Sequence, residues 1–379
     1  MTTPRSETAA PSVFRSVEFI SIVIVCAIIF AVPTILNNDY LLNKVARYLV
    51  LGIVAMSLAL SWGYGGILNL GQAVSFGLGS YAMAMALKLK TVPVQTGADG
   101  LPDFMVWNNV TALPWFWKPF ESQLFAIVAG LAIPAGIAAA LGWFMFRGRV
   151  TGVYVSIISL ATMVVLNLVM VDQQQYTGGF NGITDLAQLE LFGIKFDAYE
   201  RSTYYLVALC LTGALLVAYA FTKTKAGLIV QAVRDHESRV RYFGYDVAAF
   251  QIVTMALSAA IAGLAGMLYT VVIEFASPTF LGVQLSLSIV VWCAVGGRQS
   301  LLGAFLGAVL VAGMQGALSE SPAFLDVWTL IMGALFILTV LFLPKGLAGL
   351  VATTASHFRR RTIVPAIKAP ALEQVESKS

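Results

Sequence analysis

The sequence predicts an all-α fold: a polytopic bundle of about ten transmembrane helices. Hydrophobic residues make up 59% of the 379 positions and charged residues only 11%, less than half the charged share of a typical soluble domain. Apolar runs of about 20 residues recur along the chain, the length of helix that crosses the hydrocarbon core of a bilayer. A transmembrane β-barrel would instead show short segments of alternating polarity.

Ten apolar segments are candidates for these spans, and the count falls to nine if the short eighth segment does not cross. Residues 1–17 form an expected cytoplasmic N-terminal tail, and residues 18–351 the transmembrane domain. Residues 352–379 are first basic and then poor in apolar side chains, so we expect a disordered cytoplasmic tail. The expected spans are 18–37, 46–63, 67–88, 122–146, 151–171, 203–222, 248–272, 283–297, 300–318 and 325–343.

The distribution of positive charge predicts the orientation. Cytoplasmic loops of membrane proteins are enriched in Lys and Arg. Ten spans with both termini in the cytoplasm place most of the 23 Lys and Arg residues on that side. This topology puts residues 223–247 in the cytoplasm. It puts the loops 89–121, which carries the aromatic cluster Trp115-Phe116-Trp117, and 172–202, with its glycine-rich turn TGGFNGI, outside.

The segment KTKAGLIVQAVRDHESRVRYFGYD, residues 223–246, is dense in charge within an otherwise oily chain. We expect a helix over 227–243 that ends at Gly244, where a left-handed cap fits a glycine. The segment is either a solvated helix on the membrane surface or a docking helix for a cytoplasmic protein, and its mixed charges favour docking. The expected apolar stripe is Ile229, Val233, His236, Val240 and Phe243. The charged flanks carry Arg234, Glu237 and Arg241 on one side and Asp235 and Arg239 on the other, with Asp235–Arg239 and Glu237–Arg241 as i,i+4 pairs.

Several expected spans carry polar side chains, which are costly when they face lipid. They are either contacts between helices or the wall of a polar pathway, and the sequence leaves both interpretations open. In the glycine-rich stretch 63–84, a helix would place Asn69, Gln72 and Ser80 on one broad face. The candidate pathway residues are Asn69, Gln72, Ser75, Asn167, Gln284 and Ser288.

The sequence offers no candidate for catalysis. It has no GxxxxGK[ST] phosphate-binding loop, so any ATP-binding site belongs to a partner. His236 and His357 lack metal-ligand spacing, and no nucleophile–base set stands out, so we expect no catalytic residue, no metal site and no cofactor. No Asp or Glu falls in the middle of an expected span, whereas proton-coupled carriers usually keep such a group there. Uphill transport would therefore draw its energy from a partner.

Six stretches together resemble the LivM-type permease subunits of ABC importers for branched-chain amino acids and urea. They run in the order of that family over most of residues 60–351. They are GGILNLGQAVSFGLGSYA at 65–82, YTGGFNGITD at 176–185, AGLIVQAVRDHESRVRYFGYDV at 226–247, LSAAIAGLAGMLY at 257–269, VWCAVGGRQSLLGAFLGAVLV at 291–311 and LPKGLAGLV at 343–351.

The loop PDFMVWNNVTALPWFWKPFE, residues 102–121, is similar to the urea-transporter C-type permease. Relatives commonly have LSLGHG or LSLGHA where this chain has LNLGQA, so Gln72 replaces a histidine. If that position lines the pathway, the departure favours an amide or another small polar solute rather than urea. With the likeness to the urea type, the expected solute is urea or a short amide, with a branched-chain amino acid next.

The resemblance implies partners in a bacterial inner membrane. These are a second, homologous permease, two cytoplasmic ATP-binding subunits and a periplasmic solute-binding protein, and we expect no nucleic-acid partner. Residues 226–247 match the loop that docks on an ATP-binding subunit, which implies coupling roles for Arg234, Asp235, Glu237, Arg239, Arg241 and Gly244. The alternative functions are a stand-alone channel or secondary carrier for small neutral solutes, and a membrane enzyme.

Overall fold

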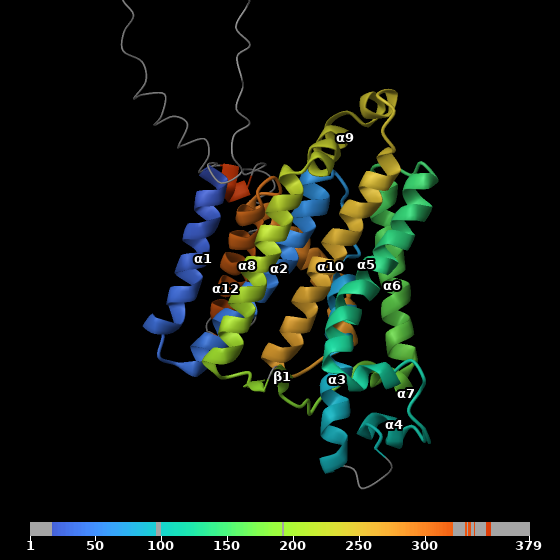
Figure 1. The fold of residues 1–379 in the computed structure, drawn as a ribbon, viewed down its shortest axis with the longest axis vertical. Helices are drawn as coiled ribbons and strands as arrows, with labels where there is room; N and C mark the ends of the chain where they lie inside the picture. The colour runs from blue at the N-terminus through green and yellow to red at the C-terminus, as the bar shows by residue number, and fades with distance from the viewer. Residues whose placement is uncertain are drawn as a thin grey trace, which may run out of the picture.

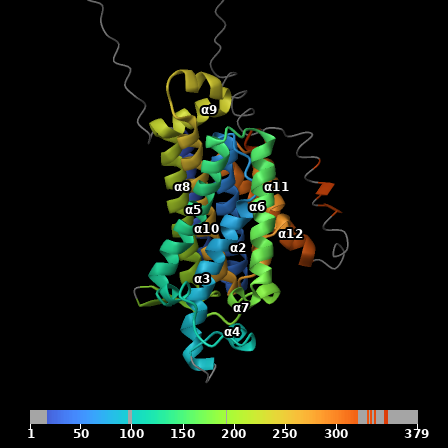
Figure 2. The same ribbon diagram turned by 90° about the vertical axis from the view of Figure 1, so that its right-hand side faces the viewer.

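The computed structural model is a bundle of long helices that run nearly parallel to one axis (Figure 1). It describes residues 17–95, 100–191, 193–320 and short pieces of 330–349, namely 330–331, 333–334, 337 and 346–349. Two ends of the bundle are distinct. Helix α9 (Lys225–Tyr242) projects beyond one end, and the short α4 (Asp103–Trp107) lies at the other (Figures 1 and 2). We call them the α9 end and the α4 end.

The long helices agree closely with most of the expected spans. They are α1 (Val17–Ile35), α2 (Asp39–Leu58) continued by a π-helix η2 (Ala59–Tyr64), α3 (Gln72–Gln95), α5 (Gln123–Arg147), α6 (Val153–Asp172), α8 (Arg201–Lys223), α10 (Val247–Ile273), α11 (Val283–Gly296) and α12 (Leu301–Glu320). Seven helices of the described residues are long and apolar enough to cross a membrane; α3 and α11 are not among them, and α11 has 14 residues. The tenth expected span, 325–343, lies almost wholly outside the described residues.

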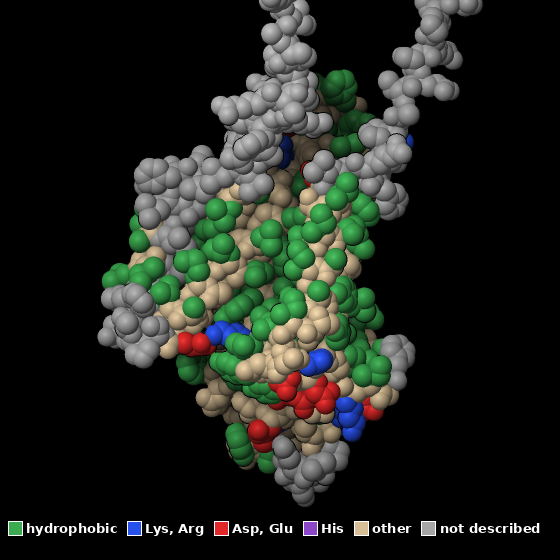
Figure 3. Space-filling view, turned by 90° about the vertical axis from the view of Figure 1, so that its left-hand side faces the viewer, with side chains coloured by type: hydrophobic (Ala, Val, Ile, Leu, Met, Phe, Trp, Pro, Cys, Tyr) green, Lys and Arg blue, Asp and Glu red, His purple; other side chains and the backbone are tan. Residues whose placement is uncertain are grey.

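Helix α10 lies at the centre of the bundle and packs on α5, α3 and α2 (Figure 1). Small residues allow the close approach of α3, because a Cβ on Gly79 would overlap the backbone of Gly263 and one on Gly266 would overlap that of Phe76. Such small-residue contacts are the usual means of packing helices in lipid. Hydrophobic side chains cover the middle of the face seen in Figure 3, and charged side chains gather toward the α4 end. This apolar band fits a bilayer.

The fold departs from the all-α expectation at the α4 end. Residues Leu189–Leu191 (β1) and Ile194–Phe196 (β2) form a two-stranded antiparallel hairpin. The remaining short elements at this end are η3 (Lys118–Glu121), α7 (Gln174–Thr177), η4 (Gly179–Asn181) and η5 (Pro278–Leu281). The glycine-rich turn is confirmed, because Gly178, Gly179 and Gly182 all have positive φ.

The helix expected over 67–88 is wrong at its start. Residues 65–71, which we call the break, are not helical, and α3 begins only at Gln72. Gly66 has φ +71°, a conformation that favours glycine. Asn69 therefore lies ahead of the helix rather than on its face.

Candidate functional site

The residues of the break are buried or half-buried except for Gly66, so most of its backbone groups need partners from the protein. Side chains from two other helices provide such partners. The Ser156 hydroxyl of α6 donates to the Leu68 carbonyl (2.8 Å), and the Ser159 hydroxyl of α6 accepts from the Leu70 N–H (3.0 Å). Ser286 of α11 donates to the Leu70 carbonyl. The break is thus a pinned, irregular segment at which α3, α6 and α11 meet.

A buried polar network fixes the start of α3. The Asn69 amide donates to Oε1 of Gln72 (2.9 Å), and Nε2 of Gln72 donates to the hydroxyls of Ser57 in α2 (2.8 Å) and Ser258 in α10 (3.1 Å). Gln72 is 0% exposed, and Ser75, one turn further along, is also buried. In this structure the two amides join α2, α3 and α10.

The other candidate pathway residues lie elsewhere. Asn167 of α6 donates to the Pro278 carbonyl (2.6 Å) and so holds η5. Gln284 and Ser288 of α11 line an open cavity of about 400 Å³ between α2, α11 and α12. Asn69, Gln72 and Ser75 are therefore buried around the break, Asn167 holds η5, and Gln284 and Ser288 lie in the open cavity. The pathway role of all six stays a prediction.

The open cavity has polar walls that the sequence analysis did not single out. They include Tyr48 of α2 and Gln315 and Ser319 of α12. Gln315 and Ser319 are four residues apart and so share one face of a helix, and this spacing could have indicated a polar face on the span. At the α4 end of α12, Lys44 pairs with Glu320 (2.5 Å).

Helix α9 confirms the helix expected over 227–243, because each of its ends lies within two residues of the expected one. Thr224 caps it by accepting from the Gly227 N–H (3.2 Å). Val233 and Val240 are buried and pack with Val247 at the start of α10. His236 has non-helical angles (φ −151°, ψ 82°), so the helix kinks there.

The kink changes which side chains are buried and paired. His236 and Phe243 were expected on the apolar stripe but are exposed. The Glu237–Arg241 pair forms (2.6 Å), whereas Asp235 pairs with its neighbour Arg234 (2.9 Å) instead of Arg239. Arg234 also donates from Nη1 to the Gly63 carbonyl (2.7 Å), so its guanidinium turns toward the bundle.

The tip of α9 presents aromatic side chains that the sequence analysis missed. Tyr242 is 91% exposed, Phe243 83% and Tyr245 48%. They flank Gly244, whose φ of +85° matches the expected left-handed cap. Exposed aromatic residues beside charges are typical of protein interfaces. The signal was in the sequence, as YFGY, but the expected helix placed Phe243 on the buried stripe.

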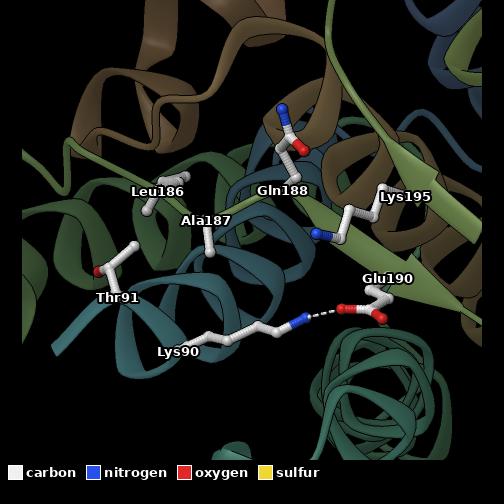
Figure 4. A pocket seen from close by; sticks show the side chains of 7 residues that line it. All are labelled: Lys90, Thr91, Leu186, Ala187, Gln188, Glu190 and Lys195. Atoms are coloured by element: carbon white, nitrogen blue, oxygen red, sulfur yellow. Dashed lines mark hydrogen bonds and ion pairs between the residues drawn. The ribbon is translucent and has the colours of Figure 1, made fainter. Parts of the chain in front are cut away.

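At the α4 end, a pocket of about 420 Å³ lies between α3 and the β1–β2 hairpin (Figure 4). The Lys90 ammonium donates to Glu190 (2.8 Å), and this hydrogen bond lowers the pKa of the Glu190 carboxyl. Lys195 points into the same pocket (Figure 4). The pocket is a polar surface feature, far from the break.

Comparison with known proteins decides the family. Residues 40–340 match the family model described as branched-chain amino acid transport system, permease component. The chain belongs to this family. It is a LivM-type permease component of an ABC transport system, not an enzyme, and a multi-pass protein of the cell (inner) membrane. Such components work with ATP-binding and solute-binding partners.

Individual relatives are distant. The permease is 26% identical over 325 residues to the high-affinity branched-chain amino acid transport system permease protein LivM of Salmonella typhimurium, covering 79% of this chain and 67% of the relative. It is 25% identical over 316 residues to a probable LivM of Methanocaldococcus jannaschii, covering 78% and 89%. The ribose import permease protein RbsC of Escherichia coli is 26% identical over 207 residues, covering 52% and 62%. No solved structure matches.

Within the part of the chain that the structure describes, no group of three or more His, Cys, Asp or Glu side chains could hold a metal ion. Polar side chains of the described residues gather around the break, in the open cavity, on α9 and in the pocket at the α4 end.

Proposed function

We propose that the permease forms half of the translocation pathway of an ATP-driven importer. A second, homologous permease would supply the other half, two ATP-binding subunits would bind on the cytoplasmic side, and a periplasmic protein would deliver the solute. The observation that carries this proposal is the tip of α9, where Tyr242, Phe243 and Tyr245 stand exposed beside paired charges outside the bundle.

The exposed tip favours a protein partner over a solvated surface helix. Aromatic side chains that remain exposed on a loop gain apolar contact only when something covers them. Glu237 and Arg241 form a pair on the segment beyond the kink, next to the aromatic tip. A groove on an ATP-binding subunit would cover the rings and meet the charges.

We further propose that the solute is small and polar, with urea or a short amide first and a branched-chain amino acid next. The likeness of residues 102–121 to the urea type of permease supports the first choice. The names of the LivM relatives support the second choice. The open cavity, with Gln284 and Ser288 in its wall, offers hydrogen-bonding groups that suit either solute.

Two variants of α9 test the docking role. Glu237→Lys leaves the membrane bundle untouched, because an exposed ion pair contributes only about 0–1 kcal/mol. Like charges brought together on docking cost several kcal/mol. Gly244→Val forces a β-branched residue into a positive φ. We expect normal membrane levels for both, weakened co-purification with the ATP-binding subunits, and loss of solute-stimulated ATP hydrolysis in liposomes.

A control and a solute assay complete the test. Arg147→Met removes an exposed pair with Asp246 (2.9 Å), the residue after the tip, but changes no side chain of α9 or of the tip, and should behave as wild type. Uptake of labelled urea, acetamide and leucine, with and without the ATP-binding subunits, identifies the solute. Wild-type docking by both α9 variants would refute the docking role, and uptake without any ATP-binding subunit would favour a stand-alone channel or carrier.

A further inference from the structure

Arg234 occupies the place where α9 meets the membrane bundle. Its Nη1 donates to the Gly63 carbonyl (2.7 Å), while its Nε and Nη2 are held by Asp235 (2.9 Å). Gly63 belongs to η2, the π-helical end of the α2 span. Short π-helical turns within α-helical spans often mark functional positions. One side chain thus joins the charged loop helix to the end of a central span.

The Gly63 carbonyl would otherwise be one of the orphan groups at a helix end. The neighbouring carbonyls of Leu60 and Trp62 accept hydrogen bonds from the two residues that follow the helix, at 3.2 and 3.0 Å. Gly63 instead receives the Arg234 guanidinium. A cation at a helix C-terminus is favourable both as a hydrogen-bond donor and against the helix dipole. Arg234 therefore satisfies a carbonyl at the point where the α2 span ends and the break begins.

The aliphatic part of Arg234 also packs on the break. A Cβ on Gly66 would lie 2.9 Å from Cγ of Arg234, so the glycine allows the side chain to lie directly on the backbone. The backbone of Arg298, which follows α11, lies closer still to the end of η2, because a Cβ on Gly63 would lie 1.6 Å from the Arg298 carbonyl oxygen. The Arg298 guanidinium stacks over the Trp62 ring (5.1 Å). The start of the break is clamped between α9 and the end of α11.

The surroundings permit movement at this clamp. The kink at His236 lies two residues beyond Arg234, so the tip of α9 can tilt relative to the turn that carries Arg234. A cavity of about 170 Å³ borders Gly66, Arg234 and Glu237. At the other end of the break, Leu70 is bonded to Ser159 of α6 and Ser286 of α11. A displacement at Gly63 would reach the helices around the buried polar network through only seven residues of chain.

We propose that Arg234 is a positioning residue that transmits the motion of α9 to the break. On this proposal Arg234 faces the bundle rather than the ATP-binding subunit, and the docked tip pulls on the α2 span through the Gly63 carbonyl. The proposal rests on the docking of α9 given above, and adds the contact by which docking changes the interior of the permease.

The test compares Arg234→Met with Arg147→Met in the assembled transporter. Methionine keeps the apolar stem on Gly66 and removes the donor to Gly63, whereas Arg147 lies at the same end and pairs with Asp246. We measure co-purification of the ATP-binding subunits, uptake of urea, acetamide and leucine, and hydrogen exchange of the amides of residues 65–71, without nucleotide and with ATP and vanadate.

We expect Arg234→Met to co-purify normally but to lose uptake by about tenfold or more. Losing a hydrogen bond from a charged donor to a buried carbonyl shifts an equilibrium by about this factor. Exchange in the break should respond to nucleotide in wild type and in Arg147→Met, and not in Arg234→Met. Arg234→Lys, which keeps a charged donor, should restore part of the uptake. Should Arg234→Met not reach the membrane, Arg234→Gln, whose amide is too short to reach Gly63, takes its place.

The outcomes separate two failures. An unchanged nucleotide response or wild-type uptake in Arg234→Met overturns the role of Arg234, and so does loss of co-purification, which would place Arg234 in the docking surface itself. A wild-type permease that binds no ATP-binding subunit overturns the proposed function, and this proposal with it.

Discussion

Gln72 accepts a hydrogen bond from Asn69 and donates to Ser57 and Ser258, so both ends of its amide are used by neighbouring chain segments. Gln284 carries the same side chain but lies exposed in the wall of the open cavity. The two glutamines therefore have different surroundings: Gln72 joins helices, whereas Gln284 borders the open cavity. A pathway role stays a prediction for both.

Gln72→Leu and Gln284→Leu should therefore differ in kind. We expect Gln72→Leu to lower the free energy of unfolding by about 1–3 kcal/mol, because buried partners lose their hydrogen bonds. Gln284→Leu should change it by less than about 0.5 kcal/mol, as exposed substitutions do, while changing the uptake ratio of urea, acetamide and leucine. Thermal unfolding in detergent and uptake assays measure both. A stable Gln72→Leu with an altered uptake ratio would place Gln72 in the pathway instead.

At the scale of elements, α3 and α10 lie so close that their backbones touch. A Cβ on Gly266 would overlap the Phe76 backbone, which cannot move aside as a flexible side chain would. Gly136 of α5 has no atom within 4 Å of the same position. The two glycines therefore offer a matched pair of sites, one crowded and one open.

Gly266→Val should lower the free energy of unfolding by at least about 1–3 kcal/mol, the usual cost of overpacking. Gly136→Val should cost less than about 1 kcal/mol, since valine differs little from glycine in helix propensity and meets no neighbour. Detergent-solubilised yield and melting temperature give the comparison. Equal losses in the two variants would contradict the close packing of α3 on α10.

The β1–β2 hairpin is tied to α3 by the Lys90–Glu190 pair. Lys90 lowers the pKa of the Glu190 carboxyl, so the pair fully stabilises the hairpin at any pH above the usual glutamate pKa. This stabilisation is lost as the pH falls through the lowered pKa of Glu190, because the carboxyl is then protonated. We expect exchange of the amides of residues 189–196, corrected for the intrinsic rate, to rise below pH 4.5 in wild type. Glu190→Gln should exchange alike on both sides of that pH. A pH-dependent Glu190→Gln would refute this cause.

The membrane-spanning fold could be read from the sequence because hydrophobic length alone predicts where helices cross. The break was missed although residues 65–71 carry three glycines, because glycine is also frequent inside membrane-spanning helices. Its shape depends on hydroxyls from Ser156, Ser159 and Ser286, which only the folded bundle brings near. Tertiary hydrogen bonds decided the local structure there.

The site was predicted unevenly for the same reason. The charged helix, its Glu237–Arg241 pair and the cap at Gly244 follow local rules, and the structure has all three. The inward turn of Arg234 depends on a carbonyl 171 residues away in the chain. The open cavity depends on which faces of α11 and α12 turn toward each other. Neither is a local property.

The orientation of the whole molecule is the remaining prediction of the charge pattern. Helix α1 begins at the α9 end, so Val17 and α9 lie on one side (Figure 1). The positive-inside rule assigns that side to the cytoplasm. The α4 end, with its aromatic residues, then faces the periplasm, where a binding protein would approach.

Single cysteines at Trp107 and Ser238, in a background with Cys26, Cys210 and Cys293 replaced by alanine, test this orientation. Trp107 lies on α4 and Ser238 on α9, and both are exposed. In intact spheroplasts an impermeant maleimide should label Trp107→Cys and leave Ser238→Cys unlabelled; after lysis both should react. Neither substitution removes a buried contact, so levels should match wild type. Labelling of Ser238→Cys before lysis would place α9 outside, where no ATP-binding subunit could reach it, and the coupling role of Arg234 would fall with the orientation.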